Sequence, residues 1–234
     1  MIAIFKRELQ AYFFSPLGYV FVGVYWLISG FFFFNSNLLG NTTDMRSMFS
    51  TMFVITLFLI PILTMRLMSE DKKMKTDQIL LMSPVSSWDV VIGKFLSAYF
   101  VYGLALSITL VMGLVLQYFS TPDWTLILGH IMGTLLLGAL LISITLFISA
   151  MTENQIVSAV LGFTASFFLM LVNTLARFIP NRFVSDIVIM FSPEQRYNDF
   201  TLGIVDLGNV LFFVTFTLLF VYFTVTVFEM RRYR

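Results

Sequence analysis

The sequence predicts an all-α polytopic membrane protein with six transmembrane helices, an N-terminal amphipathic elbow helix and both termini in the cytoplasm. Hydrophobic residues make up 59% of the 234 residues and charged residues 12%, about half the charged share of soluble domains. The mean hydropathy is +0.91. A helix needs about 20 mostly apolar residues to cross a bilayer. Six uncharged runs reach that length: Leu9–Thr43, Ser47–Met65, Phe95–Pro122, Trp124–Thr152, Asn154–Ala176 and Leu207–Phe228.

The Lys and Arg residues predict the orientation. Six spans place both termini on one side, and short segments rich in Lys and Arg stay in the cytoplasm. With both termini inside, ten of these residues are cytoplasmic: Lys6, Arg7, Arg66, Lys72, Lys73, Lys75, Lys94, Arg231, Arg232 and Arg234. Four are then outside: Arg46, Arg177, Arg182 and Arg196. We therefore expect cytoplasmic termini.

Residues 2–14 are predicted to form an amphipathic helix that lies on the inner membrane surface. Its apolar residues recur at helical spacing: Ile2, Phe5, Leu9, Tyr12 and Phe13. Ser15 is a favourable N-cap and Pro16 suits the first helical position, so we expect the chain to bend there into a first span at 16–39. The alternative is one continuous helix, which Pro16 disfavours because the residue before proline avoids the helical conformation.

The remaining spans are expected at 47–68, 93–118, 125–151, 155–176 and 207–228. Segment 177–206 is too polar to cross the membrane and is predicted to lie outside as a re-entrant or short-helix segment. There Ser192 precedes Pro193 and Glu194, a sequence typical of a helix start. All 234 residues form a single transmembrane domain in this interpretation.

Two features of the fourth span allow more than one interpretation. Gly129 and Gly133 let a second helix approach closely, either within this chain, which we favour, or at a seam between two copies. His130 lies between them at the outer end of the span, where we expect a solvated side chain.

Several kinds of chemistry are excluded by what the sequence lacks. It has no cysteine and one histidine, so it offers neither a thiolate nor a histidine-rich metal site. None of the six predicted spans has an Asp, Glu, Lys or Arg near its centre. This disfavours membrane enzymes, ion-coupled transporters and channels, which usually carry charged residues at membrane depth. Gly93-Lys94 is followed by Phe95 rather than Ser or Thr, so there is no nucleotide-binding P-loop. We expect no catalysis, no ATP hydrolysis and no bound cofactor in this chain. The net charge of +1 gives no reason to expect nucleic acid.

The most charged stretch follows the second span. Arg66 and Glu70 stand four residues apart, as do Asp71 and Lys75, and oppositely charged side chains at this spacing stabilise a helix. The second span is therefore predicted to continue as a charged helix below the bilayer.

A second short helix is predicted at Gln78–Met82, with Thr76 or Asp77 as its cap. It presents Ile79, Leu80 and Met82 just beneath the membrane. Such an apolar surface either docks on a cytoplasmic protein or rests on lipid headgroups as an ordinary solvated loop, and the residue pattern alone leaves both open.

Three stretches of the chain resemble the permease subunit of a type-two ABC exporter, and especially its gliding-motility-type branch. They are Phe5-Lys-Arg-Glu8 through Tyr12-Phe-Phe-Ser-Pro16-Leu-Gly18-Tyr19, Ile60-Pro61 through Val85 with Gly93-Lys94-Phe95, and Thr152-Glu153-Asn154-Gln155-Ile156. With the six spans, the resemblance covers essentially the whole chain. Lys75 departs from it, because the wider superfamily often has glycine before the threonine.

The resemblance implies a location in the bacterial cytoplasmic membrane and a set of partners. Such permeases pair as two identical or two different copies and bind two separately encoded ATPase subunits, which hold ATP and Mg. Segment 69–90 corresponds to the family's coupling element, which inserts into the ATPase. A membrane-anchored subunit with a large extracytoplasmic domain is also expected in the gliding-motility branch.

The resemblance also assigns roles to particular residues. The ATPase-coupling residues are Arg66, Glu70, Thr76, Asp77, Gln78, Ile79, Leu80, Leu81, Met82, Glu153, Asn154 and Gln155. The extracytoplasmic gate residues are Ser192, Pro193 and Glu194. The implied function is export of a substrate driven by the partner ATPase. The alternative is a mechanotransmitting subunit that couples ATP hydrolysis to an extracytoplasmic partner without transport, and a third possibility is a stand-alone channel.

Overall fold

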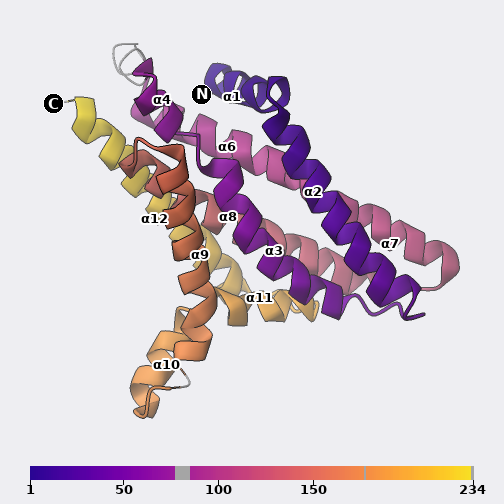
Figure 1. Ribbon diagram of the computed structural model, residues 1–234. Helices are drawn as coiled ribbons and strands as arrows, with labels where there is room; N and C mark the ends of the chain where they lie inside the picture. The colour runs from indigo at the N-terminus through magenta and orange to yellow at the C-terminus, as the bar shows by residue number, and fades with distance from the viewer. Residues whose placement is uncertain (77–84, 177, 233–234) are drawn as a thin grey trace.

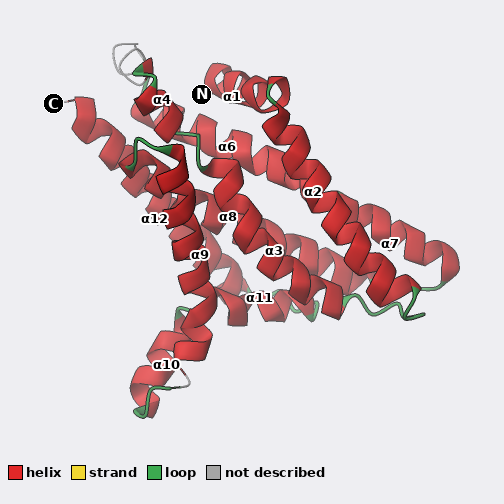
Figure 2. Cartoon of the chain, viewed as in Figure 1, coloured by secondary structure: helices red, strands yellow, loops and turns green. Residues whose placement is uncertain are grey.

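The computed structural model describes residues 1–76, 85–176 and 178–232, and the described part is built of helices with no strand (Figures 1 and 2). Six helical segments are long and apolar enough to cross a membrane, as the sequence predicted. They are Pro16–Leu38, Arg46–Lys73, Ser87–Phe119, Trp124–Met151, Gln155–Ala176 and Leu207–Arg231.

The chain breaks at Ser15, between helix α1 (Ile2–Phe14) and helix α2 (Pro16–Phe33). Ser15 has φ −93° and ψ 155°, an extended conformation that the following proline favours. Figure 1 shows α1 lying across the end of the bundle at a marked angle to α2. The continuous-helix alternative is therefore not what the structure shows. The location of α1 on the membrane surface stays a prediction.

The first three spans are not single regular helices. A π-helical turn, η1 (Phe34–Leu38), extends α2. After α3 (Arg46–Thr64), a turn leads into the short helix α4 (Ser69–Lys73). The third span consists of α6 (Ser87–Leu106) and α7 (Ile108–Phe119). Helix α6 starts at Ser87, earlier than the span predicted at 93–118, and Lys94, which we counted among the cytoplasmic residues, is buried inside the bundle.

Helix α8 (Trp124–Met151) is the centre of the fold. It packs against α3, α6, α9 (Gln155–Ala176), α11 (Pro193–Thr201) and α12 (Leu207–Arg232). In the most apolar 18-residue stretch of α8, 61% is buried, against 28% in the corresponding stretches of the first span, α9 and α12. Those three segments therefore keep wide apolar faces for lipid or for another subunit.

The glycines of α8 serve packing within this chain, as we favoured over a seam between copies. A Cβ atom at Gly133 would lie 2.5 Å from Cβ of Phe200 on α11, and one at Gly138 would lie 2.1 Å from Cε1 of Tyr102 on α6. Small residues allow this close approach between helices in lipid.

Gly138→Ala is expected to lower stability by about 1–3 kcal/mol, the usual range for an overpacked core. Gly23→Ala on α2 is the matched control, since a Cβ there meets no atom within 4 Å. Alanine at 23 should leave the melting temperature in detergent unchanged or slightly raised, because alanine is the better helix former. Equal melting temperatures for the two variants would contradict this packing.

Both termini lie at one end of the bundle, and α10 (Arg182–Met190) and α11 lie at the other (Figure 1). Which end is cytoplasmic is a prediction from the Lys and Arg distribution. The chain has no cysteine, so single cysteines report orientation without background. Lys73→Cys is expected to be shielded from an impermeant thiol reagent in intact cells, and Asn181→Cys to react. The opposite pattern would reverse the orientation.

Candidate functional site

A buried charge cluster joins α1, α4 and α6 at the end of the bundle that holds the termini. Nζ of Lys94 on α6 lies 3.0 Å from Oε1 of Glu8 on α1 and 2.6 Å from Oδ2 of Asp71 on α4. It also donates a hydrogen bond to the carbonyl oxygen of Leu67, at 2.6 Å. Lys94 is only 1% exposed. A cation so deeply buried is stable only with such partners, so this ammonium ties the three helices together.

Asp71 is the hub of the cluster. Besides Lys94, its carboxylate accepts a hydrogen bond from Oγ1 of Thr76 at 2.7 Å and lies 3.7 Å from the guanidinium of Arg7. Partial burial disfavours the charge of that guanidinium, but the Glu8 and Asp71 carboxylates outweigh it and raise the pKa of Arg7. The predicted ion pair between Asp71 and Lys75 is not among the contacts of the described residues.

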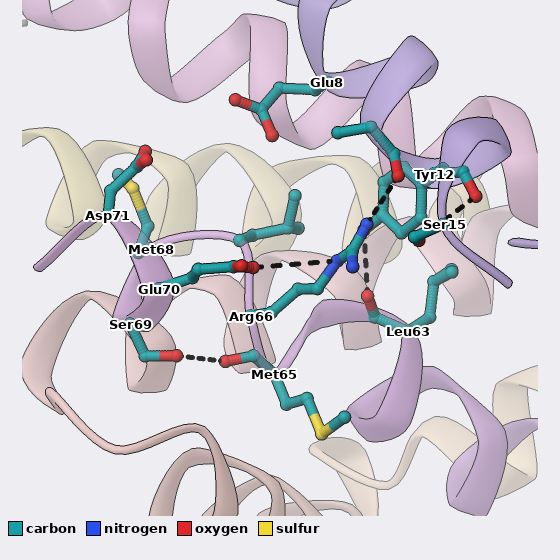
Figure 3. Close-up of polar contacts among 12 residues, drawn as sticks. Glu8, Tyr12, Ser15, Leu63, Met65, Arg66, Met68, Ser69, Glu70 and Asp71 are labelled. Carbon is teal, nitrogen blue, oxygen red and sulfur yellow. Dashed lines mark hydrogen bonds and ion pairs between the residues drawn. The ribbon is translucent and has the colours of Figure 1, made fainter. Parts of the chain in front are cut away.

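Arg66 forms a second junction between the end of α3 and α1 (Figure 3). Its Nη2 donates to the carbonyl oxygen of Ala11 at 2.9 Å, and its guanidinium lies 5.2 Å from the ring centre of Tyr12. The hydroxyl of Tyr12 donates to the carbonyl oxygen of Leu63 at 2.8 Å, and burial raises the pKa of that hydroxyl. The predicted pair of Arg66 with Glu70 is present at 3.9 Å.

The same segment is fixed to α8 by Ser149. The Ser149 hydroxyl accepts from the backbone N–H groups of Met68 and Ser69, both at 3.1 Å, and donates to the carbonyl oxygen of Met65. Lys72 donates to the carbonyl oxygen of Ala150. The chain that leaves α3 is therefore tied to three neighbouring helices before it reaches residue 77.

A cavity of about 530 Å³, with charged side chains among its lining, lies between α1 and α4. Its lining includes Arg7, Tyr12, Arg66, Glu70 and Thr76. The cavity is continuous with the charge cluster, because Glu8, Asp71 and Lys94 also line it.

The predicted coupling residues are divided between this junction and a separate turn. Arg66, Glu70 and Thr76 belong to the junction, whereas Asp77, Gln78, Ile79, Leu80, Leu81 and Met82 lie outside the described residues. Glu153, Asn154 and Gln155 form the turn from α8 to α9. There the Asn154 side chain accepts from the N–H of Ile156 at 2.9 Å, and the Glu153 carboxylate lies 3.9 Å from Arg231.

The predicted gate residues lie at the start of α11, at the other end of the bundle. Ser192 occupies the N-cap position and Pro193 the first turn, but the Ser192 side chain makes no capping hydrogen bond. Oε2 of Glu194 lies 3.5 Å from Nδ2 of Asn173 on α9.

His130 corrects one sequence prediction. We expected a solvated side chain, yet His130 is 0% exposed. The expectation assumed that the end of the span faces water, but α11 folds back over α8 and covers the imidazole with Tyr197. The segment that provides this cover is remote in sequence, so the local pattern around His130 gives no sign of it.

Glu8, Asp71 and Lys94 are the junction residues that sequence reasoning missed as a group. Each stands in a stretch singled out by the resemblance, but their meeting depends on how α1 folds back against α6. One sequence signal was present: Lys94 and Asp89 are the only charged residues between 87 and 120.

Lys75 ends α4 in a strained conformation. Its φ is +58°, in the left-handed region that costs an L-residue about 1–2 kcal/mol and glycine little. Lys75→Gly is therefore expected to stabilise the protein by up to about 1 kcal/mol after the added entropy of the unfolded chain is counted. Thermal unfolding compared with Lys73→Gly, which changes a helical position, measures it. If Lys75→Gly lowers the melting temperature as much as Lys73→Gly does, Lys75 is not strained.

Comparison with known proteins agrees with a membrane domain of this architecture. The family model described as ABC-2 family transporter protein matches residues 15–229. A search of curated proteins finds no match. The match extends over nearly the whole chain and includes the six apolar helices, except the last two residues of the sixth. The chain therefore belongs to the ABC-2 transporter family and is a permease-type, multi-pass membrane component of an ABC transporter. The family implies partnership with ATPase subunits.

Proposed function

We propose that this chain is the permease subunit of an ABC exporter of the cytoplasmic membrane and that segment 69–90 couples it to a separate ATPase. The observation that carries the proposal is the Glu8–Asp71–Lys94 cluster, in a chain whose family works with ATPase subunits. An element that transmits force needs a rigid base. The base of this segment is fixed to α1, α6 and α8.

The proposed mechanism is a change between two conformations that the ATPase selects. ATP and Mg bind in the ATPase subunits, whose closure draws together the 69–90 segments of two paired permeases. Because the charge cluster links each segment to α1 and α6, a displacement of the segment moves those helices with it. ATP can drive this cycle only if the ATPase interacts differently with the two conformations. No bond of the substrate is broken by this chain.

The junction around Arg66 adds a second connection to the same movement. The guanidinium holds the end of α1 through the Ala11 carbonyl and the Tyr12 ring, while Glu70 on α4 holds the guanidinium. We propose the turn at 153–155 as a smaller second contact with the ATPase.

The alternative function is mechanotransmission, with an extracytoplasmic partner in place of a substrate. It uses the same base and the same ATPase. Vesicles that hold the permease and its ATPase separate the two functions. An exporter moves a compound across the membrane in proportion to ATP hydrolysed. A mechanotransmitter hydrolyses ATP without such movement and changes the reactivity of its extracytoplasmic segments.

A stand-alone channel is the third candidate function, and vesicles that hold the permease without its ATPase test it. If the purified chain conducts ions or solutes with no ATPase present, then neither export nor mechanotransmission describes it.

A further inference from the structure

Helix α11 is attached to the bundle by a buried polar contact that the proposed function does not use. Tyr197 on α11 is 1% exposed, and its hydroxyl lies 2.9 Å from Nδ1 of His130 on α8. The same hydroxyl lies 3.2 Å from Oγ1 of Thr134 and donates to the carbonyl oxygen of Phe49 on α3 at 3.3 Å. One side chain of α11 thus binds two spans.

His130 has two hydroxyl neighbours, Tyr197 on α11 at 2.9 Å and Thr134 on its own helix at 3.3 Å from Nδ1. Its ring stacks on Phe49 with 3.6 Å between ring centres and 3° between planes, so one face is covered by carbon. Burying a polar group without a hydrogen-bond partner costs about 1–3 kcal/mol in proteins. The Tyr197 hydroxyl is the nearer of the two partners of the imidazole, and separation of α11 from α8 removes that shorter contact.

The fit of α11 on α8 is equally close along the rest of the helix. A Cβ atom at Gly129 would lie 2.6 Å from the carbonyl oxygen of Phe200, and Gly133 faces the Phe200 side chain. At the other end of α11, Ser192 is 0% exposed. In the described part of the chain its hydroxyl has no hydrogen-bond partner. This helix is therefore seated in the bundle rather than resting on its surface.

We propose that Tyr197 and His130 form a latch that positions α11 over the outer end of the permease, and that α11 separates from α8 when the outer end opens. The inference rests on the proposed function and deepens it. Ser192, Pro193 and Glu194 belong to the moving helix, whereas the contact that sets its closed position lies at Tyr197 and His130. Both are positioning residues and touch no substrate.

The latch is tested with a single cysteine at Ser192, in a chain that has none of its own. Ser192→Cys is nearly isosteric and loses no side-chain hydrogen bond. In the closed state the thiol is buried, so an impermeant maleimide added outside intact cells reacts only when α11 separates. Adding Tyr197→Phe keeps the ring and removes the hydroxyl. One net hydrogen bond of about 1.4 kcal/mol corresponds to a tenfold change, so we expect labelling to become about tenfold faster.

Two controls separate the latch from general loosening. Tyr118→Phe removes an exposed hydroxyl and should leave the labelling rate unchanged. A second reporter, Ala98→Cys, lies fully buried in α6 and should stay unlabelled with Tyr197→Phe. Equal acceleration at 98 and 192 would show unfolding and overturn the proposal, as would an unchanged rate at 192.

His130→Phe tests whether the two residues act together, because phenylalanine keeps the stacked ring. Alone, it removes one of the three polar contacts of the Tyr197 hydroxyl, so it is expected to accelerate labelling at 192 less than Tyr197→Phe does. Combined, the two changes should accelerate it no more than Tyr197→Phe alone, since that change already removes the contact with His130. Multiplied effects of the two changes would show independent roles and overturn the latch.

The labelling needs neither ATP nor the ATPase, so it is independent of the test of the proposed function. If the chain binds no ATPase, the labelling rates still decide whether the latch exists. If the rates show no latch, co-purification with an ATPase is unaffected.

Discussion

The double variant Ile79→Asp, Leu80→Asp is expected to reach the membrane at normal levels and to lose its ATPase. Both residues lie in the stretch that we propose to insert into the ATPase, and insertion would bury two uncompensated carboxylates. An unpaired buried charge costs several kcal/mol, and a loss of about 4 kcal/mol weakens binding about a thousandfold. Co-purification of the tagged permease with the ATPase, and stimulated ATP hydrolysis in vesicles, measure the effect.

A matched control places the same two charges elsewhere. Leu202 and Ile204 are exposed just after α11, which lies at the end of the bundle away from the termini. Leu202→Asp with Ile204→Asp should therefore leave ATPase binding intact. Normal ATPase stimulation in the 79 and 80 variant would rule out segment 76–82 as the coupling element. The loop would then fit the other interpretation, a solvated segment on lipid headgroups.

Lys94→Met is expected to be the most destabilising single change at the junction. It removes the buried cation that Glu8 and Asp71 share and leaves these mostly buried carboxylates only the more exposed guanidinium of Arg7 as a cation. Breaking a buried ion pair from one side costs about 3–5 kcal/mol. The melting temperature in detergent should fall by several degrees or more. Because α1 and α4 lose their common partner, ATP hydrolysis should also become less dependent on the permease.

The triple variant Lys94→Met, Glu8→Gln, Asp71→Asn shows whether charge pairing is the cause. Removing all the charges of a buried cluster together is often nearly neutral for stability, so the triple variant should regain most of the lost melting temperature. Lys73→Met is the control for loss of an exposed lysine. A Lys94→Met protein as stable as Lys73→Met would show that the cluster does not hold the three helices together.

The six membrane-crossing helices were predictable because their signal is local. Each needs only a run of about 20 apolar residues, and the break at Ser15 follows from Pro16 alone. The division of the third span at Ser107 and the early start of α6 carry no such signal. A lysine ordinarily marks the end of a span, and Lys94 can lie inside the bundle because Glu8, Asp71 and the Leu67 carbonyl surround its ammonium.

The candidate site was predictable only where its residues are neighbours in the sequence. Arg66 and Glu70 were found from their helical spacing, and the pair is present. Asp71 was assigned to Lys75, but the left-handed conformation of Lys75 ends the helix, and Asp71 pairs with α6. His130 was expected in water because it stands at the outer end of its span. The helix that covers it, α11, begins more than 60 residues later.

The most direct measurement of the central claim is affinity purification of the full-length chain from its native membrane, followed by an ATP hydrolysis assay. We expect a nucleotide-hydrolysing subunit to co-purify in equal amount with the permease, and the Ile79→Asp, Leu80→Asp variant to lose it. A chain that purifies alone and is active with no ATPase attached would contradict the account.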